Sequence, residues 1–203
     1  MRGPTTLRRP AQQETDVPHT VLPPDGAPAM PTPLVLRDGR QIIVRPVGPG
    51  DAPALQRMHA RLSVDTIRLR FFGLVPSLSD ERAHYFADLD GVRRYALAAL
   101  DPENPSEFIA VVRYDRGPID AAADDEGADA AEYAAVVRDD WQGHGLGLGM
   151  TESLIVHARE SGIRRIFALV IPENNRMLKL FHRLDLPMHV AWQDGLTRVE
   201  LYL

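Results

Sequence analysis

The sequence predicts one domain of the mixed α/β class, of the α+β kind, in which helices pack against a sheet. Three observations lead to this prediction. A chain of 203 residues, 44% of them hydrophobic, can bury one sizeable core and is short for two domains. Segments with the period of strands and segments with the period of helices follow one another along it. A glycine-rich segment also separates one predicted strand from the helix that follows.

The first 33 residues are predicted to form a disordered Pro-rich tail, and residues 34–203 the folded domain. The tail holds eight prolines and has no sustained apolar periodicity, so burial cannot offset the entropy lost on ordering it. Its arginines are followed by no apolar segment, and nothing in the chain approaches the about 20 apolar residues of a membrane span. A cytoplasmic protein with no membrane partner is therefore expected.

The folded part is predicted to begin with a short strand, residues 41–45, followed by three helices. Asp51 is a suitable N-cap for the first helix, and Pro53 lies in its first turn. The second helix is expected over residues 64–72. The third is expected over residues 79–89, because a serine at its start can cap it and acidic residues fill its first turn.

Strands are predicted next. Residues 95–100 and 108–114 are rich in strand-forming residues and are joined by a turn that contains two prolines, which indicates an antiparallel pair. Residues 115–130 are acidic and rich in Ala and Gly, which is typical of a surface loop. A further strand, residues 131–138, leads into the glycine-rich segment.

The remaining elements alternate between helix and strand. A helix is predicted over residues 146–161, with Gly162 in position to end it. An apolar strand over residues 166–171 and an amphipathic helix over residues 174–184 follow. Residues 189–203 are predicted to form a closing hairpin around an Asp-Gly turn.

Composition excludes several classes of function. A net charge of -5 argues against a nucleic-acid partner, because neutralising phosphates requires a basic face. The chain has no cysteine, which excludes disulfides, thiolate zinc sites and a covalent cysteine intermediate. The histidines of the predicted domain outside the glycine-rich segment show no metal-binding spacing, so no metal is expected. They are His59, His84, His157, His182 and His189.

The segment from Gln142 to Gly147 carries the main functional signal. Glycines between a strand and a helix leave backbone N–H groups free to face a ligand, and the helix N-terminus favours an anion such as a phosphate. Its spacing excludes two nucleotide-binding motifs. The dinucleotide fingerprint requires glycine where Leu148 or Met150 stands, and a P-loop requires a lysine that is absent here. The pattern that remains is Q-x-x-G-x-G.

With this pattern, the chain resembles the GNAT (GCN5-related N-acetyltransferase) superfamily, whose acetyl-CoA loop reads [QR]-x-x-G-x-[GA] after the fourth strand. The predicted order of elements over residues 36–203 is similar to that family's layout. The resemblance implies a mixed, mostly antiparallel central sheet that is split at the acetyl-CoA site and flanked by helices.

More narrowly, the chain resembles the acetyltransferase domain of bacterial protein lysine acetyltransferases of the Pat type. In several relatives this domain is fused to an acyl-CoA-synthetase-like region or to a cyclic-nucleotide-binding domain. Residues 1–33 are too few for a regulatory domain, so control by cyclic nucleotide is not expected. The segments that carry the resemblance are Arg37-Asp38-Gly39, Ile43-Val44-Arg45-Pro46, Leu62-Ser63, Arg70-Phe71-Phe72-Gly73, Ala131-Glu132-Tyr133-Ala134 and Trp141-Gln142-Gly143.

The resemblance implies a role for each matched residue. The end of the strand before the loop is expected to bind the pantetheine arm through its backbone, and the loop to hold the pyrophosphate. Asn174 matches the family asparagine that faces the cofactor arm. The expected cofactor-binding residues are Val136, Val137, Arg138, Gln142, Gly143, His144, Gly145, Leu146, Gly147 and Asn174.

Two positions depart from the family pattern. His144 stands where an arginine or lysine is frequent, and histidine is a weaker phosphate contact than a permanently charged side chain. Phe181 stands where many members carry a tyrosine that can protonate the leaving thiolate. Tyrosine acid catalysis from position 181 is therefore excluded.

Transfer to an amine requires a group that removes a proton. An alkyl ammonium has a pKa of about 10.4, so presenting the free amine at neutral pH costs roughly 4.6 kcal/mol. Glu132 matches the catalytic glutamate of Pat-type enzymes, and partial burial would suit it to act as a base through a water. The alternative is that Glu132 is a solvated residue at the edge of the acidic loop. Asp139 and Asp140 are further candidates, although turn residues of this type more often bond nearby amides.

The sequence therefore predicts an N-acetyltransferase that uses acetyl-CoA, with a protein lysine side chain as the acceptor and direct attack in a ternary complex. Two alternatives stay open. One is an acetyltransferase for small-molecule amines, which would use the same cofactor site. The other is a non-catalytic acyl-CoA-binding sensor. The sequence does not distinguish a monomer from a homodimer.

Overall fold

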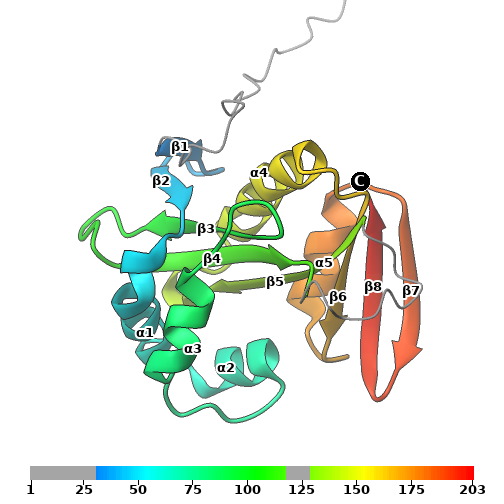
Figure 1. Cartoon of the computed structure of the whole chain (residues 1–203), viewed down its shortest axis with the longest axis horizontal. Coiled ribbons are helices and arrows are strands. Elements are labelled where there is room, and N and C mark those ends of the chain that lie inside the picture. The colour runs from blue at the N-terminus through cyan, green and yellow to red at the C-terminus, as the bar shows by residue number, and fades with distance from the viewer. Residues whose placement is uncertain (1–30, 118–128) are drawn as a thin grey trace, which may run out of the picture.

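The computed structural model describes residues 31–117 and 129–203 (Figure 1). This part of the chain contains one eight-stranded sheet, in the order β1-β2-β3-β4-β5-β6-β8-β7. Neighbouring strands are antiparallel except β5 and β6, which are parallel, so the predicted mixed, mostly antiparallel sheet is confirmed. The strands are β1 (Thr32–Val35), β2 (Gln41–Pro46), β3 (Arg94–Leu100), β4 (Phe108–Asp115), β5 (Ala130–Val137), β6 (Arg165–Val170), β7 (Met188–Gln193) and β8 (Leu196–Tyr202).

Helices flank the sheet on both faces. The core between α1, α3 and the sheet is separate from the core beneath α4 and α5. Strand β3 contributes to both, because Ala96 and Ala98 face the first core, whereas Leu97 and Ala99 face the second. The helices are α1 (Ala52–Ala60), α2 (Val64–Phe71), α3 (Asp80–Ala87), α4 (Leu146–Glu160) and α5 (Asn175–Arg183), with short 3-10 turns at Pro49–Asp51 and Asp139–Trp141.

The helices begin and end at the residues that their local chemistry favours. The side chains of Ser63 and Ser79 accept hydrogen bonds from backbone N–H groups at the starts of α2 and α3. Asn174 caps α5 in the same way, with Oδ1 accepting from the N–H of Met177 at 3.1 Å. Gly162 follows α4 with a φ of +77°, a left-handed conformation that favours glycine. These signals lie within each helix, which is why the predicted limits agree closely with the structure.

Strand β1 corrects the predicted tail. It begins at Thr32, so the last two residues of the expected tail, Thr32 and Pro33, belong to the sheet. Among the described residues β1 is a short edge strand that pairs only with β2, and its pairing partner rather than its own composition determines that it forms. The predicted tail over residues 1–30 lies outside the described residues. So does most of the predicted acidic loop, whose first residue, Asp115, is the last of β4.

The sheet is split between β5 and β6. The two strands pair only from Ala130 with Arg165 to Glu132 with Phe167. Beyond Glu132, β5 stays paired with β4 as far as Val137, while β6 stays paired with β8. The split therefore opens on the side from which the chain enters the glycine-rich segment, as the family resemblance implied.

Candidate active site

A cavity of about 530 Å³ lies where β5 and β6 separate, among α2, α5 and the glycine-rich segment. Its volume is typical of small-molecule sites in proteins. Most of the residues that the sequence predicted to be catalytic or cofactor-binding line this cavity. They are Glu132, Val136, Val137, Gln142, Gly143, Gly145, Leu146, Gly147 and Asn174. Two predicted cofactor-binding residues, Arg138 and His144, are not among the residues that line this cavity.

Three positions of the glycine-rich segment favour glycine, two because of their φ angles and one because a side chain would be crowded. Gly143 and Gly145 have φ angles of +84° and +88°, in the left-handed region that favours glycine. Gly147 lies in the first turn of α4, where a Cβ would come within 3.4 Å of the side chains of Val137 and Leu180. The N–H groups of this first turn have no partner within the helix and carry its partial positive charge. The segment therefore offers an anion site beside the cavity.

Strand β5 presents backbone groups to the split. The N–H of Arg138 donates to the carbonyl of Ile109 on β4 at 2.8 Å, and successive strand residues direct their backbone groups to opposite sides. The backbone groups of Ala135 and Val137 therefore point away from β4, toward the split. Those of Val136 point toward β4, so this residue contributes its side chain to the cavity wall. Ala135 is a candidate contact that was not predicted from the sequence.

Gln142 connects the glycine-rich segment to three other elements. Its Nε2 donates to the carbonyl of Val137 at 2.9 Å and to Oγ1 of Thr66 on α2 at 3.2 Å. Its Oε1 accepts a hydrogen bond from Arg176 on α5. The glutamine of the Q-x-x-G-x-G pattern thus fixes the loop against the end of β5 and against both flanking helices.

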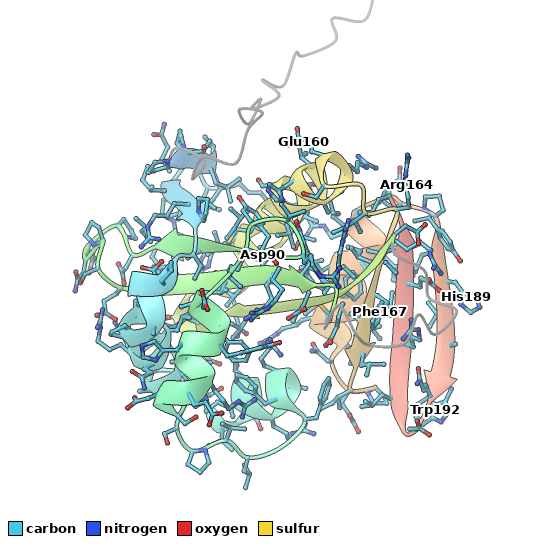
Figure 2. All side chains as sticks on the ribbon, viewed as in Figure 1. Asp90, Glu160, Arg164, Phe167, His189 and Trp192 are labelled. Atoms are coloured by element: carbon cyan, nitrogen blue, oxygen red, sulfur yellow. The ribbon has the colours of Figure 1, made fainter. Side chains whose placement is uncertain are left out.

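Glu132 lies at the last residue pair before the strands separate, in register with Phe167 of β6, and Phe167 is labelled in Figure 2. Glu132 lines the cavity but is exposed, so the predicted partial burial is wrong. Arg70, at the end of α2, lines the same cavity. Burial lowers the pKa of Arg70, and the negative charge of Glu132 opposes this shift, so the two charges influence each other.

Comparison with known proteins establishes the family. Residues 63–186 match the model of the acetyltransferase (GNAT) family. This chain belongs to the GNAT family. It is 30% identical over 146 residues to an acetyltransferase of Pseudomonas aeruginosa, covering 71% of this chain and 74% of that protein. It is also 30% identical over 158 residues to acetyltransferase Pat of Mycolicibacterium smegmatis, which covers 76% of this chain but only 44% of Pat.

A solved structure agrees with these relatives. The GNAT domain of S. lividans PAT superposes with a TM-score of 0.76 at 38% sequence identity, covering 85% of this chain and 97% of that domain. The predicted resemblance to GNAT proteins, and within them to Pat-type acetyltransferase domains, is confirmed. The protein is therefore an acyltransferase of a family that uses acetyl-CoA and an amine acceptor.

Within this GNAT domain, Arg138 has a structural role. Its guanidinium is buried and bonds to Asp101 at 3.0 Å and to Asp140 at 2.7 Å. Its carbonyl accepts from the N–H of Trp141, and its own N–H is bonded to β4. The side chain and both backbone groups of Arg138 are therefore engaged within the protein, and its contact with the cofactor stays a prediction. Asp140 serves as its ion-pair partner.

Asp139 joins the loop to α2. It accepts hydrogen bonds from the N–H and Oγ of Ser63, at 2.9 and 2.7 Å, and from Oγ1 of Thr66 at 2.7 Å. Burial raises the pKa of Asp139, but these hydrogen bonds outweigh that effect and leave the pKa below its usual value. The carboxylate is thus held in its charged form by structural contacts, which supports the prediction that it bonds nearby groups.

His144 packs instead of lining the cavity. Its ring lies edge-on to that of Trp141, with the ring centroids 6.4 Å apart. The guanidinium of Arg40 lies over the same Trp141 ring, 4.6 Å from its centroid. Nδ1 of His144 is buried and has no hydrogen-bond partner within residues 31–117 and 129–203. The loop position that often carries a charged side chain in GNAT proteins is here a histidine that packs against Trp141.

Phe181 is buried beside Tyr133 of β5, with their ring centroids 5.6 Å apart in an edge-to-face arrangement. The hydroxyl of Tyr133 lies 2.7 Å from Oγ1 of Thr151, which itself donates to the carbonyl of Gly147 at 2.6 Å. Because Thr151 uses its proton for Gly147, Tyr133 must be the donor to Thr151. Burial raises the pKa of Tyr133 well above its usual value. This hydroxyl therefore remains protonated and, through Thr151, holds the carbonyl of Gly147 in place.

The cavity also has residues that were not predicted from the sequence. From α2 and the residue after it come Thr66, Leu69, Arg70 and Phe72, and from α5 come Arg176, Lys179 and Arg183. The three basic residues of α5 recur at helical spacing and so share one face, a signal that is visible in the sequence. The α2 residues carry no such signal, because only the tertiary structure brings them to the cavity.

Membrane-spanning helices and metal-binding clusters are both absent from the described part of the chain. No helix in residues 31–117 or 129–203 has the length and hydropathy needed to cross a membrane. Within the same residues, no group of three or more acidic or histidine side chains is arranged to hold a metal ion.

Proposed function

We propose that this GNAT protein transfers an acetyl group from acetyl-CoA to an amine, with a protein lysine side chain as acceptor, by direct attack in a ternary complex. The observation that carries the proposal is the position of Glu132. It stands where β5 and β6 separate and lines the same cavity as the glycine-rich segment. A base and an anion site thus border one cavity, which is the arrangement that transfer from an anionic thioester to an amine requires.

The residues around the cavity fit acetyl-CoA. The glycine-rich segment suits the pyrophosphate, and the basic residues of α5 add charge beside it. Apolar side chains such as Met177 and Leu180 suit the alkyl portion of the pantetheine arm. Asn174 uses Oδ1 for its cap, so its amide nitrogen is the end that can donate to a ligand. When bound, acetyl-CoA supplies a thioester whose acyl carbon accepts the amine nitrogen.

Residues of this chain are proposed to accept the proton of the amine and to stabilise the acyl oxygen. Glu132 accepts the proton of the amine, through a water because the carboxylate is exposed. The N–H groups of Ala135 and Val137, directed into the split, can donate to the acyl oxygen as negative charge develops on it. Phe181 supplies no proton, so the proton that Glu132 has accepted can return through the same water to the thiolate that leaves.

The test is the substitution Glu132→Gln, which keeps the shape of the side chain and removes its basicity. We expect kcat to fall by about 100-fold or more, a typical effect of losing a general base, while the Kd for acetyl-CoA by calorimetry stays within about twofold. Glu152→Gln, an exposed substitution on α4, is the matched control. Unchanged turnover in Glu132→Gln would remove Glu132 from this role.

A protein lysine is proposed as the acceptor because the chain is similar to Pat-type domains. Incubation of purified protein with acetyl-CoA and candidate proteins, followed by mass spectrometry, should reveal acetylated lysines. Turnover with small amines alone would favour a small-molecule acetyltransferase. Acetyl-CoA binding without transfer to any amine would favour the sensor. The cytoplasmic location and the choice between monomer and homodimer stay predictions, for fractionation and light scattering to test.

A further inference from the structure

A second, smaller cavity adjoins the main one on the face of the sheet that carries α1, α2 and α3. It has a volume of about 50 Å³ and lies between these helices and strands β4 and β5. Arg70, Ala134 and Val136 line both cavities. Ala134 is two residues from Glu132 on the same strand, so the two side chains share a face of the sheet. The small cavity therefore lies on the side from which an acceptor would reach Glu132.

Arg113 of β4 is a buried cation on the wall of this cavity. It is only 7% exposed, and its Nη2 has no hydrogen-bond partner in the described part of the chain. Its guanidinium lies 4.6 Å from the ring centroid of Phe86. Buried donors of this kind are rare in proteins and call for an explanation, because each loses its hydrogen bonds to water.

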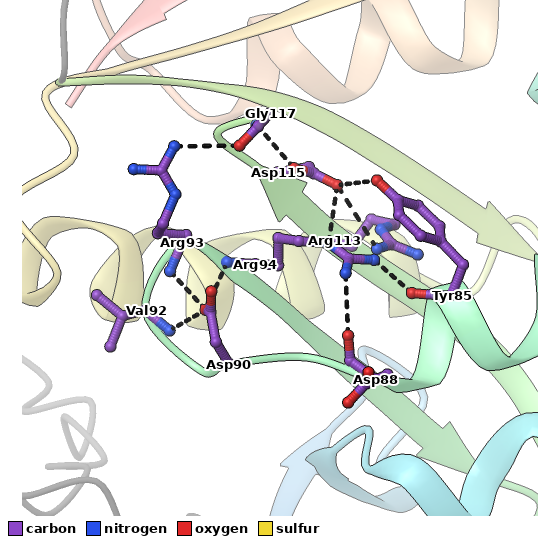
Figure 3. A network of polar contacts seen from close by, with 9 residues as sticks. All are labelled: Tyr85, Asp88, Asp90, Val92, Arg93, Arg94, Arg113, Asp115 and Gly117. Atoms are coloured by element: carbon purple, nitrogen blue, oxygen red, sulfur yellow. Dashed lines mark hydrogen bonds and ion pairs between the residues drawn. The ribbon is translucent and has the colours of Figure 1, made fainter. Parts of the chain in front are cut away.

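The carboxylate of Asp115, which pairs with Arg113, also binds two other side chains. Asp115 lies 4.0 Å from Nη2 of Arg113, but its Oδ2 is closer to Arg94, at 3.2 Å, and also accepts from the hydroxyl of Tyr85 at 3.2 Å (Figure 3). Burial first, and then the charge of Arg70, lower the pKa of Arg113 to about 10 against the opposing influence of Asp115. The guanidinium stays protonated at neutral pH, with its charge incompletely balanced.

Other groups on this wall are also compatible with an anion. Arg70 adds a second guanidinium, and Arg82 lies close enough for its charge to lower the pKa of Arg70. Nε2 of His59 is buried without a hydrogen-bond partner in the described residues. Burial lowers the pKa of His59, and the charge of Arg82 adds to this, so the neutral ring can donate one hydrogen bond.

We propose that this small cavity is an acceptor subsite in which Arg113 and Arg70 bind a carboxylate of the molecule that carries the reacting amine. The inference rests on the proposed function, because it specifies the acceptor of the same site. A carboxylate matches the planar donor geometry of guanidinium, and the cavity has room for a group of a few atoms. The carboxylate could belong to a free amino acid or to an acidic residue beside a lysine in a protein.

The test compares matched acceptors that differ only in the carboxylate. Free lysine is paired with cadaverine, and a peptide with glutamate next to its lysine is paired with the same peptide carrying glutamine. We expect the protein to prefer the carboxylate-bearing member of at least one pair by about tenfold in kcat/KM, mainly through KM, because hydrogen bonds to charged groups have effects of this size. The pair that shows the preference identifies the source of the carboxylate.

Substitution of Arg113 by methionine should abolish this preference, while Arg113→Lys should retain part of it. Arg159→Met, an exposed substitution on α4 at the other face of the sheet, is the matched control. If thermal unfolding shows that Arg113→Met does not fold, Arg113→Lys and Arg70→Met decide the matter. A preference that survives in the folded variants, or equal kcat/KM values within both pairs, would overturn the proposal.

Binding without turnover separates this inference from the proposed function. Nε-acetyllysine and N-acetylcadaverine are reaction products that differ in the carboxylate, as do the acetylated forms of the two peptides, and calorimetry measures the binding of each without catalysis. We expect the carboxylate-bearing product of at least one pair to bind about tenfold more tightly, and Arg113→Met to remove the difference. This result would support the subsite even if no amine were acetylated. Equal binding within both product pairs would contradict it even if Glu132 proved to be the base.

Discussion

The two sides of the split are built in different ways. The proposed cofactor side is built mainly from residues 135–147, a continuous stretch that ends in the first turn of α4, and we propose that its backbone N–H groups bind the cofactor. The proposed acceptor side is assembled from side chains of α1, α2, β4 and β5, which are far apart in the sequence. Backbone geometry therefore controls the first side, and tertiary packing and charge control the second. Substitutions should separate the two.

Gly145→Val should produce the largest effect on the cofactor side. Its φ of +88° is strained for any β-branched residue, so the loop must rearrange and its N–H groups must move. We expect the affinity for acetyl-CoA, measured by calorimetry, to fall by about 100-fold or more. Gly195→Val is the matched control, because Gly195 has a φ of +81° but lies in the turn between β7 and β8. Near-native affinity in Gly145→Val would contradict the assignment of the loop.

Gln142→Ala should have a smaller effect. The loop keeps its backbone but loses the bonds that attach it to Val137, Thr66 and Arg176, so we expect about tenfold weaker acetyl-CoA binding. Gln56→Ala is a suitable control, since Gln56 also makes two hydrogen bonds, to Leu78 and Asp80, away from the loop. If both variants bind acetyl-CoA equally well, the cofactor side does not depend on side chains for its position.

Asp139→Asn should have the smallest effect, on stability. The folded-state pKa of Asp139 is lowered, so its charge stabilises the fold above the unfolded pKa of about 3.9, and this contribution is lost as pH falls through the folded pKa. We expect Tm to fall by about 2–4 °C at pH 7 and the gap to wild type to close in acid. Asp65→Asn, at an exposed position of α2, controls for the change in net charge. A gap that is constant with pH would contradict this account.

The cofactor side was largely predictable from the sequence because its determinants are local. The glycines, the strand before them and the helix after them occupy one continuous segment, and the spacing of the glycines and the absence of a nearby lysine excluded two other nucleotide motifs. Arg138 is the exception within this segment. Its ion pair with Asp101 joins residues 37 positions apart, and no local pattern reveals such a contact.

The acceptor side was not predictable in the same way. Glu132 was identified through the family resemblance, but its position at the split depends on where β6 separates from β5. Arg70 and Arg113 have no shared sequence pattern, and only the packing of α2 against β4 and β5 brings them to one cavity. Strand β1 was missed for a related reason, since an edge strand of four residues depends on its partner.

The hydroxyl of Thr66 joins α2 to the glycine-rich loop. It donates to Asp139 at the start of the loop and accepts from Gln142 within it, while other residues of α2 border the proposed acceptor side. If the proposed function holds, a movement of the loop on binding acetyl-CoA would act on the helix that meets the amine. The binding of the two ligands would then be thermodynamically coupled. The factor by which acetyl-CoA changes the affinity for the acceptor would equal the factor by which the acceptor changes the affinity for acetyl-CoA.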